Sequence, residues 1–186
     1  LRNSESEKGV FPTFFDLQDI LPGGIEESHY SKDTQSDYVG ALCTRVKSLT
    51  NGIYGSVLCA EDALSDAEMF DQNVIVDLSR VGSMETKSLL MGSLVMKLQE
   101  YRMCSSGMNS RLRHVTVLEE AHNLLRKTSA EQSQEGANLQ GKSVEMLAKA
   151  IAEMRTYGEG YIIADQAPGL LDMSVIRNTT TTISLR

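Results

Sequence analysis

The fold class that the sequence predicts is α/β, with a parallel sheet covered by helices on both faces. Two observations indicate it. Short apolar runs, typical of strands buried on both faces, alternate along the chain with segments whose apolar residues recur at helical spacing. The composition, 41% hydrophobic and 23% charged in 186 residues, is typical of one globular domain. The predicted strands are Val74–Leu78, His114–Leu118, Tyr161–Ala164 and Thr180–Leu185.

Two long helices are expected between these strands. Ser83 and Glu85 open the first, which extends to about Arg102. Ser143 is expected to cap the second, which ends near Tyr157. The segments around them are predicted to be a loop at Cys104–Arg113, a short helix at Ala121–Lys127 and a polar, mobile stretch at Thr128–Gly141.

The first part of the chain has a different pattern. Residues 1–35 are polar with short apolar patches, which predicts a polar segment with one short docking helix. Apolar residues at helical spacing between Val39 and Leu49 predict a helix that stops at Asn51. The run Ile53–Leu58 is a strand candidate, and Glu61–Phe70 is expected to be an acidic loop or a turn of helix.

Composition and charge limit the function classes. Phosphate contacts need a basic face, so a net charge of −7 is not typical of a nucleic-acid-binding surface, although a ring motor needs only a few basic residues in its pore. No apolar stretch approaches the ~20 residues that span a bilayer. The polar start is no signal peptide, and three cysteines show no metal-like spacing. A cytoplasmic protein without a transmembrane segment is expected. The missing initial Met and the strand-like end suggest a piece of a longer protein.

The functional candidates are polar residues at the carboxyl ends of the predicted strands, where open α/β sheets bind ligands. They are Asp77 and Ser79, Glu119 and Glu120, and Asp165 and Gln166. Two adjacent acids after a buried strand have a use in phosphoryl transfer: one lies near the magnesium of a bound nucleotide, and the next orients and deprotonates the attacking water. The alternative is a solvated turn, in which a helix N-terminus favours the charge of Glu120.

Several segments, in the same order, resemble the HerA–FtsK superfamily of RecA-like motor ATPases. Val115–Leu125 is similar to the Walker B element of that superfamily, which usually reads Asp-Glu-Ala-His followed by apolar residues. Glu153–Gly160, the next strand and Gln166–Pro168 are similar to its Arg–Tyr–Gly, strand, Gln-x-Pro segment. Further similarities are Asn178-Thr179 with the run to Arg186 and, to the conjugative-secretion ATPases of the superfamily, Gly52–Gly55 and Val74–Ser79.

This resemblance implies a RecA-like fold that is incomplete, because strand 1 and the phosphate-binding (Walker A) loop are missing. Residues 36–186 would form the C-terminal part of the ATPase domain. Glu119 would hold Mg²⁺ through water, Glu120 would activate the attacking water, and Gln166 would sense the γ-phosphate of ATP. Arg155 would be an arginine finger that reaches a neighbour's nucleotide. Glu119 departs from the family, which usually has Asp there.

Each of these assignments has a structural alternative. Arg155 lies in the last turn of a predicted helix, where the helix dipole favours any cation. Gln166 could hydrogen-bond the turn before Pro168, and Asp77 could be a structural acceptor at a strand end. His122 beside the two glutamates could suggest a metal site, but the spacing matches no zinc pattern.

Gly136–Ser143 fits the expression Gly-x-x-x-x-Gly-Lys-Ser of a phosphate-binding loop. The mechanism requires a buried strand directly before such a loop, and the residues before Gly136 have no strand character. The segment also follows the Walker B strand instead of preceding it. We therefore interpret it as a coincidental match, although Lys142 could act at a subunit boundary or on DNA.

The function that the resemblance implies is ATP hydrolysis coupled to DNA translocation or unwinding. The parent would be a hexameric ring with DNA and possible nuclease or secretion-machinery partners, and the isolated chain would bind ATP and Mg²⁺ poorly without the Walker A loop. Two alternatives remain open. One is a degenerate, non-catalytic ATPase module used for assembly or docking. The other is a conjugative type IV secretion ATPase, which would associate with a membrane.

Overall fold

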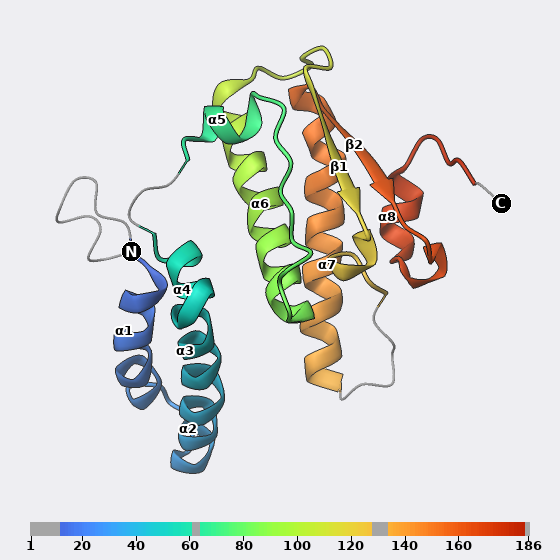
Figure 1. Ribbon diagram of the computed structural model, residues 1–186. Coiled ribbons are helices and arrows are strands. Elements are labelled where there is room, and N and C mark those ends of the chain that lie inside the picture. The colour runs from blue at the N-terminus through green and yellow to red at the C-terminus, as the bar shows by residue number, and fades with distance from the viewer. Residues whose placement is uncertain (1–11, 61–63, 128–133, 185–186) are drawn as a thin grey trace. The chain divides into compact units, whose positions relative to one another are not determined.

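A computed structural model describes residues 12–60, 64–127 and 134–184 of the chain. The chain divides into two compact units, Leu1–Leu64 and Ser65–Arg186 (Figure 1). The sequence suggested a boundary after residue 35. That boundary came from the resemblance to a family, and a division of the chain by compactness does not test it.

The described part of the first unit is helical. Its elements are α1 (Phe14–Glu26), α2 (Lys32–Tyr38), a π-helical turn (Val39–Cys43), α3 (Thr44–Thr50) and α4 (Gly52–Leu58). A capping box starts α1, because the Thr13 hydroxyl accepts from the Asp16 amide while the Asp16 carboxylate accepts from the Thr13 amide at 2.6 Å. α1 packs against α3, and the Thr50 hydroxyl donates to Gln18 Oε1 at 2.7 Å. The short helix expected within the first 35 residues is therefore present as α1.

The strand expected at Ile53–Leu58 is wrong, because these residues lie in α4. A short apolar run does not by itself distinguish a strand from a buried helix. Gly55 shows how closely this helix approaches the preceding one: a Cβ at this position would lie 2.0 Å from the carbonyl oxygen of Thr50. Only glycine lets α4 approach the end of α3 so closely.

The second unit is mixed α/β, which confirms the predicted class at this level. The two strands among its described residues, β1 (His114–Glu119) and β2 (Glu159–Ala164), pair in parallel, with His114 opposite Glu159 and Glu119 opposite Ala164. The other elements are α5 (Asp66–Phe70), α6 (Met84–Ser105), the 3-10 turn η2 (Ala121–Asn123), α7 (Gln134–Met154), the 3-10 turn η3 (Arg155–Tyr157), the 3-10 turn η4 (Pro168–Leu170) and α8 (Met173–Asn178).

Two predicted strands are not strands in the described residues. Val74–Leu78 pairs with no strand, and Ile75 is 95% exposed. Residues 180–184 form no strand either, and Ile183 is 81% exposed, while Leu185 lies outside the described residues. An apolar run predicts an extended backbone, but a strand also needs a partner for its ladder of hydrogen bonds. The described sheet therefore has two strands, where four were expected.

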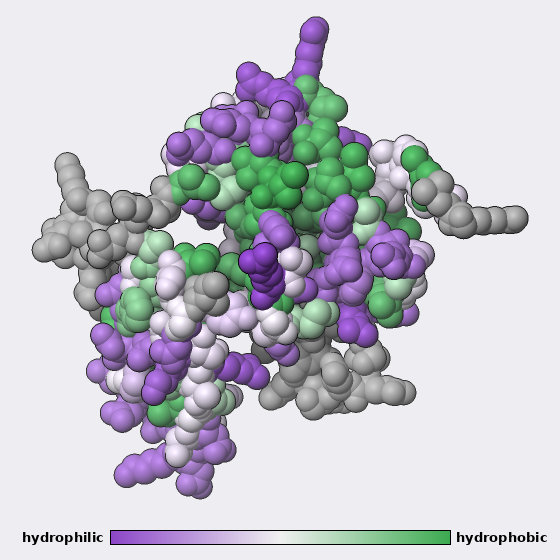
Figure 2. Space-filling model, viewed as in Figure 1, coloured by the Kyte–Doolittle hydropathy of each residue, from purple (hydrophilic) through white to green (hydrophobic). Residues whose placement is uncertain are grey.

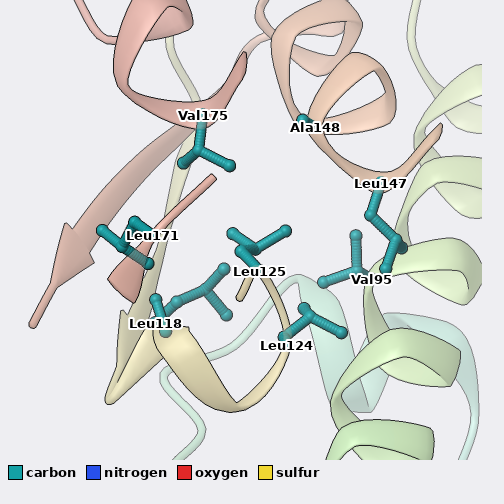
Figure 3. Packing of buried hydrophobic residues seen from close by; sticks show 9 residues of the cluster. Val95, Leu118, Leu124, Leu125, Leu147, Ala148, Leu171 and Val175 are labelled. Carbon is teal, nitrogen blue, oxygen red and sulfur yellow. The ribbon is translucent and has the colours of Figure 1, made fainter. Parts of the chain in front are cut away.

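The core of this unit lies on one face of the sheet. Leu118 of β1 packs with Val95 of α6, Leu147 of α7 and Val175 of α8, and Leu124 and Leu125 point into the same cluster (Figure 3). The opposite face is open in the part of the chain that the structure describes, since Val115, Val117 and Ile162 are exposed. Figure 2 shows apolar surface over these strands. The expectation of helices on both faces is thus wrong for the described residues.

The helix boundaries agree with the sequence in one case and differ in the other. Ser83 caps α6 by accepting from the Thr86 amide at 3.3 Å, as predicted. α7 begins at Gln134, so Ser143 lies inside the helix and is not its cap. Residues 134–141 of the expected mobile stretch are helical, and residues 128–133 lie outside the described residues. None of the described helices is long and apolar enough to cross a membrane.

Candidate functional site

The parallel pairing of β1 and β2 brings two of the predicted polar segments to the same end of the sheet. Glu119 closes β1 opposite Ala164, the last residue of β2. Glu120 and the Asp165-Gln166 pair therefore follow neighbouring strand ends (Figure 1). Glu119, Glu120 and Gln166 are all exposed. Side chains that leave parallel strands at this edge are placed where α/β proteins bind ligands.

Glu120 has an unusual backbone. Its φ of 48° and ψ of 46° lie in the left-handed region, which residues with a Cβ rarely adopt. The turn reverses the chain sharply after β1 and leads into η2. Asn123 Nδ2 donates to Glu120 Oε2 at 3.4 Å, which is a weak contact that leaves the carboxylate exposed. A strained backbone at a polar residue beside a strand end is typical of a functional position.

Two neighbouring leucines anchor the turn that carries Glu120. The side chains of Leu124 and Leu125 are buried in the main hydrophobic cluster (Figure 3). The Leu125 carbonyl accepts from the Asp172 amide at 2.9 Å, and the Lys127 amide donates to the Leu170 carbonyl at 2.8 Å. The segment after β1 is thus attached to the segment after β2. This rigid base holds Glu120 although its own side chain is free of strong contacts in the described part of the chain.

Asp165 is the most buried polar side chain at this edge, with 2% of its side chain exposed. Its Oδ1 accepts from the Ala167 amide at 2.7 Å, and its Oδ2 accepts from the His122 amide at 2.8 Å and lies 2.9 Å from His122 Nδ1. Burial raises the pKa of Asp165, but the two amides and the ring outweigh burial and hold the pKa below its ordinary value. The carboxylate is therefore ionised at neutral pH. The sequence placed Asp165 at this edge without assigning it a role.

The residues fit a magnesium nucleotide only in part. Two carboxylates at a strand end suit the water shell of a divalent cation. However, the described residues contain no group of three or more His, Cys, Asp or Glu side chains that could hold a metal ion directly. The backbone from Gly136 to Ser143 is helical, so this segment is not a phosphate-binding loop, as the sequence argument had concluded. The described residues thus place two carboxylates at a strand end but show no phosphate-binding loop beside them.

Three further candidates are Arg155, Asp77 and Ser79. Arg155 is exposed in η3, just before the start of β2, and the six residues of β2 separate it from Gln166 by about 20 Å of strand. The structure therefore does not bring Arg155 to Glu120 within one chain. Asp77 is a structural acceptor, since its Oδ1 accepts from the Ser79 amide at 2.8 Å. The amide and hydroxyl of Ser79 lower the pKa of Asp77.

A charged network that the sequence analysis missed lies at the opposite end of the strands. The Glu159 side chain is fully buried and accepts from Arg102 Nε at 3.0 Å and from the Thr116 hydroxyl at 2.7 Å. His114 Nδ1 lies 2.7 Å from the same carboxylate, and Arg102 Nη1 also contacts Asp71 at 2.6 Å. A weak sequence signal for it was an arginine in the last turn of α6. Because each charge has a partner, the network is best explained as a structural clamp between α6 and the sheet.

Comparisons of this chain with protein-family models, with curated proteins and with solved structures found no match. A function for the chain must therefore be argued from its residues and their geometry.

Proposed function

We propose that this chain provides the Walker B and sensor part of a HerA–FtsK-type ATPase that moves DNA. One observation carries the proposal: Glu119 ends one parallel strand and Glu120 follows it, while Gln166 follows the end of the directly neighbouring strand. The left-handed backbone of Glu120 supports it further, because strain of this kind persists where a side chain must be aimed. The order of the motifs along the sequence also supports the proposal.

Each side chain has a defined role in this proposal. Glu119 contacts the water shell of Mg²⁺, and Glu120 orients the attacking water and accepts its proton. Gln166 contacts the γ-phosphate of ATP from the neighbouring strand end. Arg155 acts on the nucleotide of an adjacent subunit in a ring, which agrees with its distance from the other three residues in one chain. ATP and Mg²⁺ supply the phosphoryl chemistry when bound, and the phosphate-binding loop has to come from outside this sequence.

The test uses the longest natural reading frame that contains this chain. Glu120→Gln removes the proton acceptor and keeps the size of the side chain, so we expect ATP turnover to fall by at least about a hundredfold while Mg-ATP binding persists. Glu153→Gln is the matched control, because Glu153 is an exposed glutamate near the end of α7, before the start of β2 and not at the carboxyl ends of the strands. Unchanged turnover in Glu120→Gln would exclude the assigned role.

A second candidate function is a non-catalytic module that keeps the ATPase fold for assembly or docking. The observation that favours it is the helical backbone of Gly136–Ser143, which leaves the described residues without a phosphate cradle. The same reading frame distinguishes the two candidates. If the natural protein neither binds nor hydrolyses ATP in the presence of Mg²⁺ and DNA, the module is the better explanation.

A further inference from the structure

The Asp165 carboxylate is a buried charge that none of the proposed roles uses. All of its hydrogen bonds go to two short turns. One oxygen accepts from Ala167, and the other accepts from the backbone and contacts the ring of His122. Its side chain is 2% exposed, so little water competes for these bonds. Hydrogen bonds to an ionised acceptor are stronger than neutral ones.

The positions of these bonds along the chain matter as much as their strength. His122 lies two residues after Glu120 in the turn that leaves β1. Gln166 lies between Asp165 and Ala167, so the bond to Ala167 fixes the short turn that carries Gln166. One carboxylate is thus bonded to both turns, 43 residues apart in sequence, and each turn carries an exposed candidate side chain.

The two turns can move independently only if the Asp165 carboxylate breaks its hydrogen bonds to one of them. The Asn123 contact to Glu120 is long, at 3.4 Å, and stays within its own turn. The backbone contacts of Lys127 and Asp172 lie farther along each segment, next to the core. The ladder of β1 and β2 ends with the pair Glu119 and Ala164, directly before the two turns. Beyond these strand ends, at the level of Glu120 and Gln166, the bonds of Asp165 connect the two turns in the described residues.

We propose that Asp165 is a positioning residue that couples the turn of Glu120 to the turn of Gln166, so that a displacement of either turn is transmitted to the other. The coupling itself follows from the contacts of Asp165. Its meaning for catalysis rests on the proposed function. Glu120, which activates water, and Gln166, which senses the γ-phosphate, then change position together. When a bound γ-phosphate displaces Gln166, the hydrogen bonds of Asp165 transmit this displacement to the turn of Glu120.

The experiment measures amide hydrogen exchange by NMR in the 186-residue chain without nucleotide. Asp165→Asn leaves one acceptor oxygen, which suffices for one turn but not for both. His122→Ala removes only the ring contact and keeps the backbone donor. Asp172→Asn is the matched control, because Asp172 also accepts from a backbone amide two residues on, that of Ser174 at 2.8 Å, and its side chain joins no second turn.

We expect exchange at the His122 and Ala167 amides to accelerate together in Asp165→Asn, by at least about tenfold at each. In His122→Ala, exchange at Ala167 should accelerate although the His122 side chain does not contact that residue. Asp172→Asn should leave both amides unchanged. If only one amide responds in Asp165→Asn, or if Ala167 keeps its exchange rate in His122→Ala, Asp165 is a local turn cap and the coupling is absent. Because no nucleotide is present, failure of the proposed ATPase role would not affect this result.

Discussion

At the scale of single residues, Glu120 joins a candidate chemical role to an unfavourable backbone conformation. A left-handed conformation costs a residue with a Cβ about 1–2 kcal/mol, and glycine avoids this cost but has more conformational freedom to lose on folding. We therefore expect Glu120→Gly to raise the free energy of unfolding of the chain by about 0.5–1 kcal/mol. Urea unfolding measures the change. The same substitution should abolish ATP turnover in the natural protein if the proposed function is correct.

Asn109→Gly provides the control for this prediction. Asn109 has a φ of 59° and lies in the loop between α6 and β1. Asparagine tolerates the left-handed region better than glutamate, so the gain should be smaller than for Glu120→Gly. A loss of stability in Glu120→Gly would mean that the carboxylate stabilises the turn more than its backbone strain destabilises it.

Glu159 carries a fully buried charge, so its removal should affect stability. Its removal in Glu159→Ala leaves Arg102, with 6% of its side chain exposed, without its buried partner. Breaking a buried pair in this way costs about 3–5 kcal/mol, so a large fall in the free energy of unfolding is expected. The comparison is Asp66→Ala, which breaks the exposed pair of Asp66 with Lys97. Equal effects of the two substitutions in urea unfolding would show that the Glu159 network contributes no more than a surface pair.

The residues of the candidate site could be predicted to the extent that local sequence determines them. Glu119, Glu120 and Gln166 follow apolar runs, and these runs are strands in the structure. Asp77 accepts from a residue two positions away, which is again a local effect. The partners of Glu159 and Asp165 could not be predicted, because Arg102 and His122 lie 57 and 43 residues from them in the sequence. Such pairs depend on which elements meet in three dimensions.

At the scale of elements, the sequence predicted those that carry their own signals. α6 has a serine cap and a long apolar surface, and β1 and β2 are short β-branched runs bounded by polar turns. Val74–Leu78 has the same apolar signal but finds no ladder partner in the described residues. The first turns of α7 have no apolar periodicity, so their helical backbone could not be inferred from pattern alone.

The turn before β2 depends on one glycine. Gly158 has a φ of 82°, and a Cβ there would lie 2.4 Å from the carbonyl oxygen of Arg111. Its own carbonyl accepts from the Arg113 amide at 2.8 Å, which aligns the starts of the two strands. We expect Gly158→Ala to lower the free energy of unfolding by more than about 1 kcal/mol. Thermal unfolding followed by circular dichroism measures the effect.

The control for the glycine prediction is Gly107→Ala. Gly107 lies in the same loop region before β1, has open space around it and shows no left-handed φ. Its replacement should leave the unfolding temperature close to that of the parent chain. If Gly158→Ala were equally neutral, the turn would have to rearrange without disturbing the register of the strands.

At the scale of the whole molecule, the two hydrophobic clusters of the second unit predict that this unit folds by itself. Both clusters consist entirely of residues between Met69 and Val175. A chain of residues 65–186 should therefore unfold in one cooperative transition, as a domain with its own core does. Urea unfolding and the dispersion of NMR amide signals test this expectation.

A shorter chain that starts at Gly82, and so keeps the Ser83 cap of α6, makes this last test specific. It lacks Phe70, which packs with Leu98 and Met154, and it lacks Asp71, the second partner of Arg102. Loss of a buried phenylalanine alone costs about 3–5 kcal/mol, so the shorter chain should be markedly less stable than residues 65–186. Broad, non-cooperative unfolding of residues 65–186 would give a different result. It would mean that the core on one face of the described two-stranded sheet is too small to keep this unit folded by itself. The exposed face of Val115, Val117 and Ile162 would then have to be covered for this unit to fold.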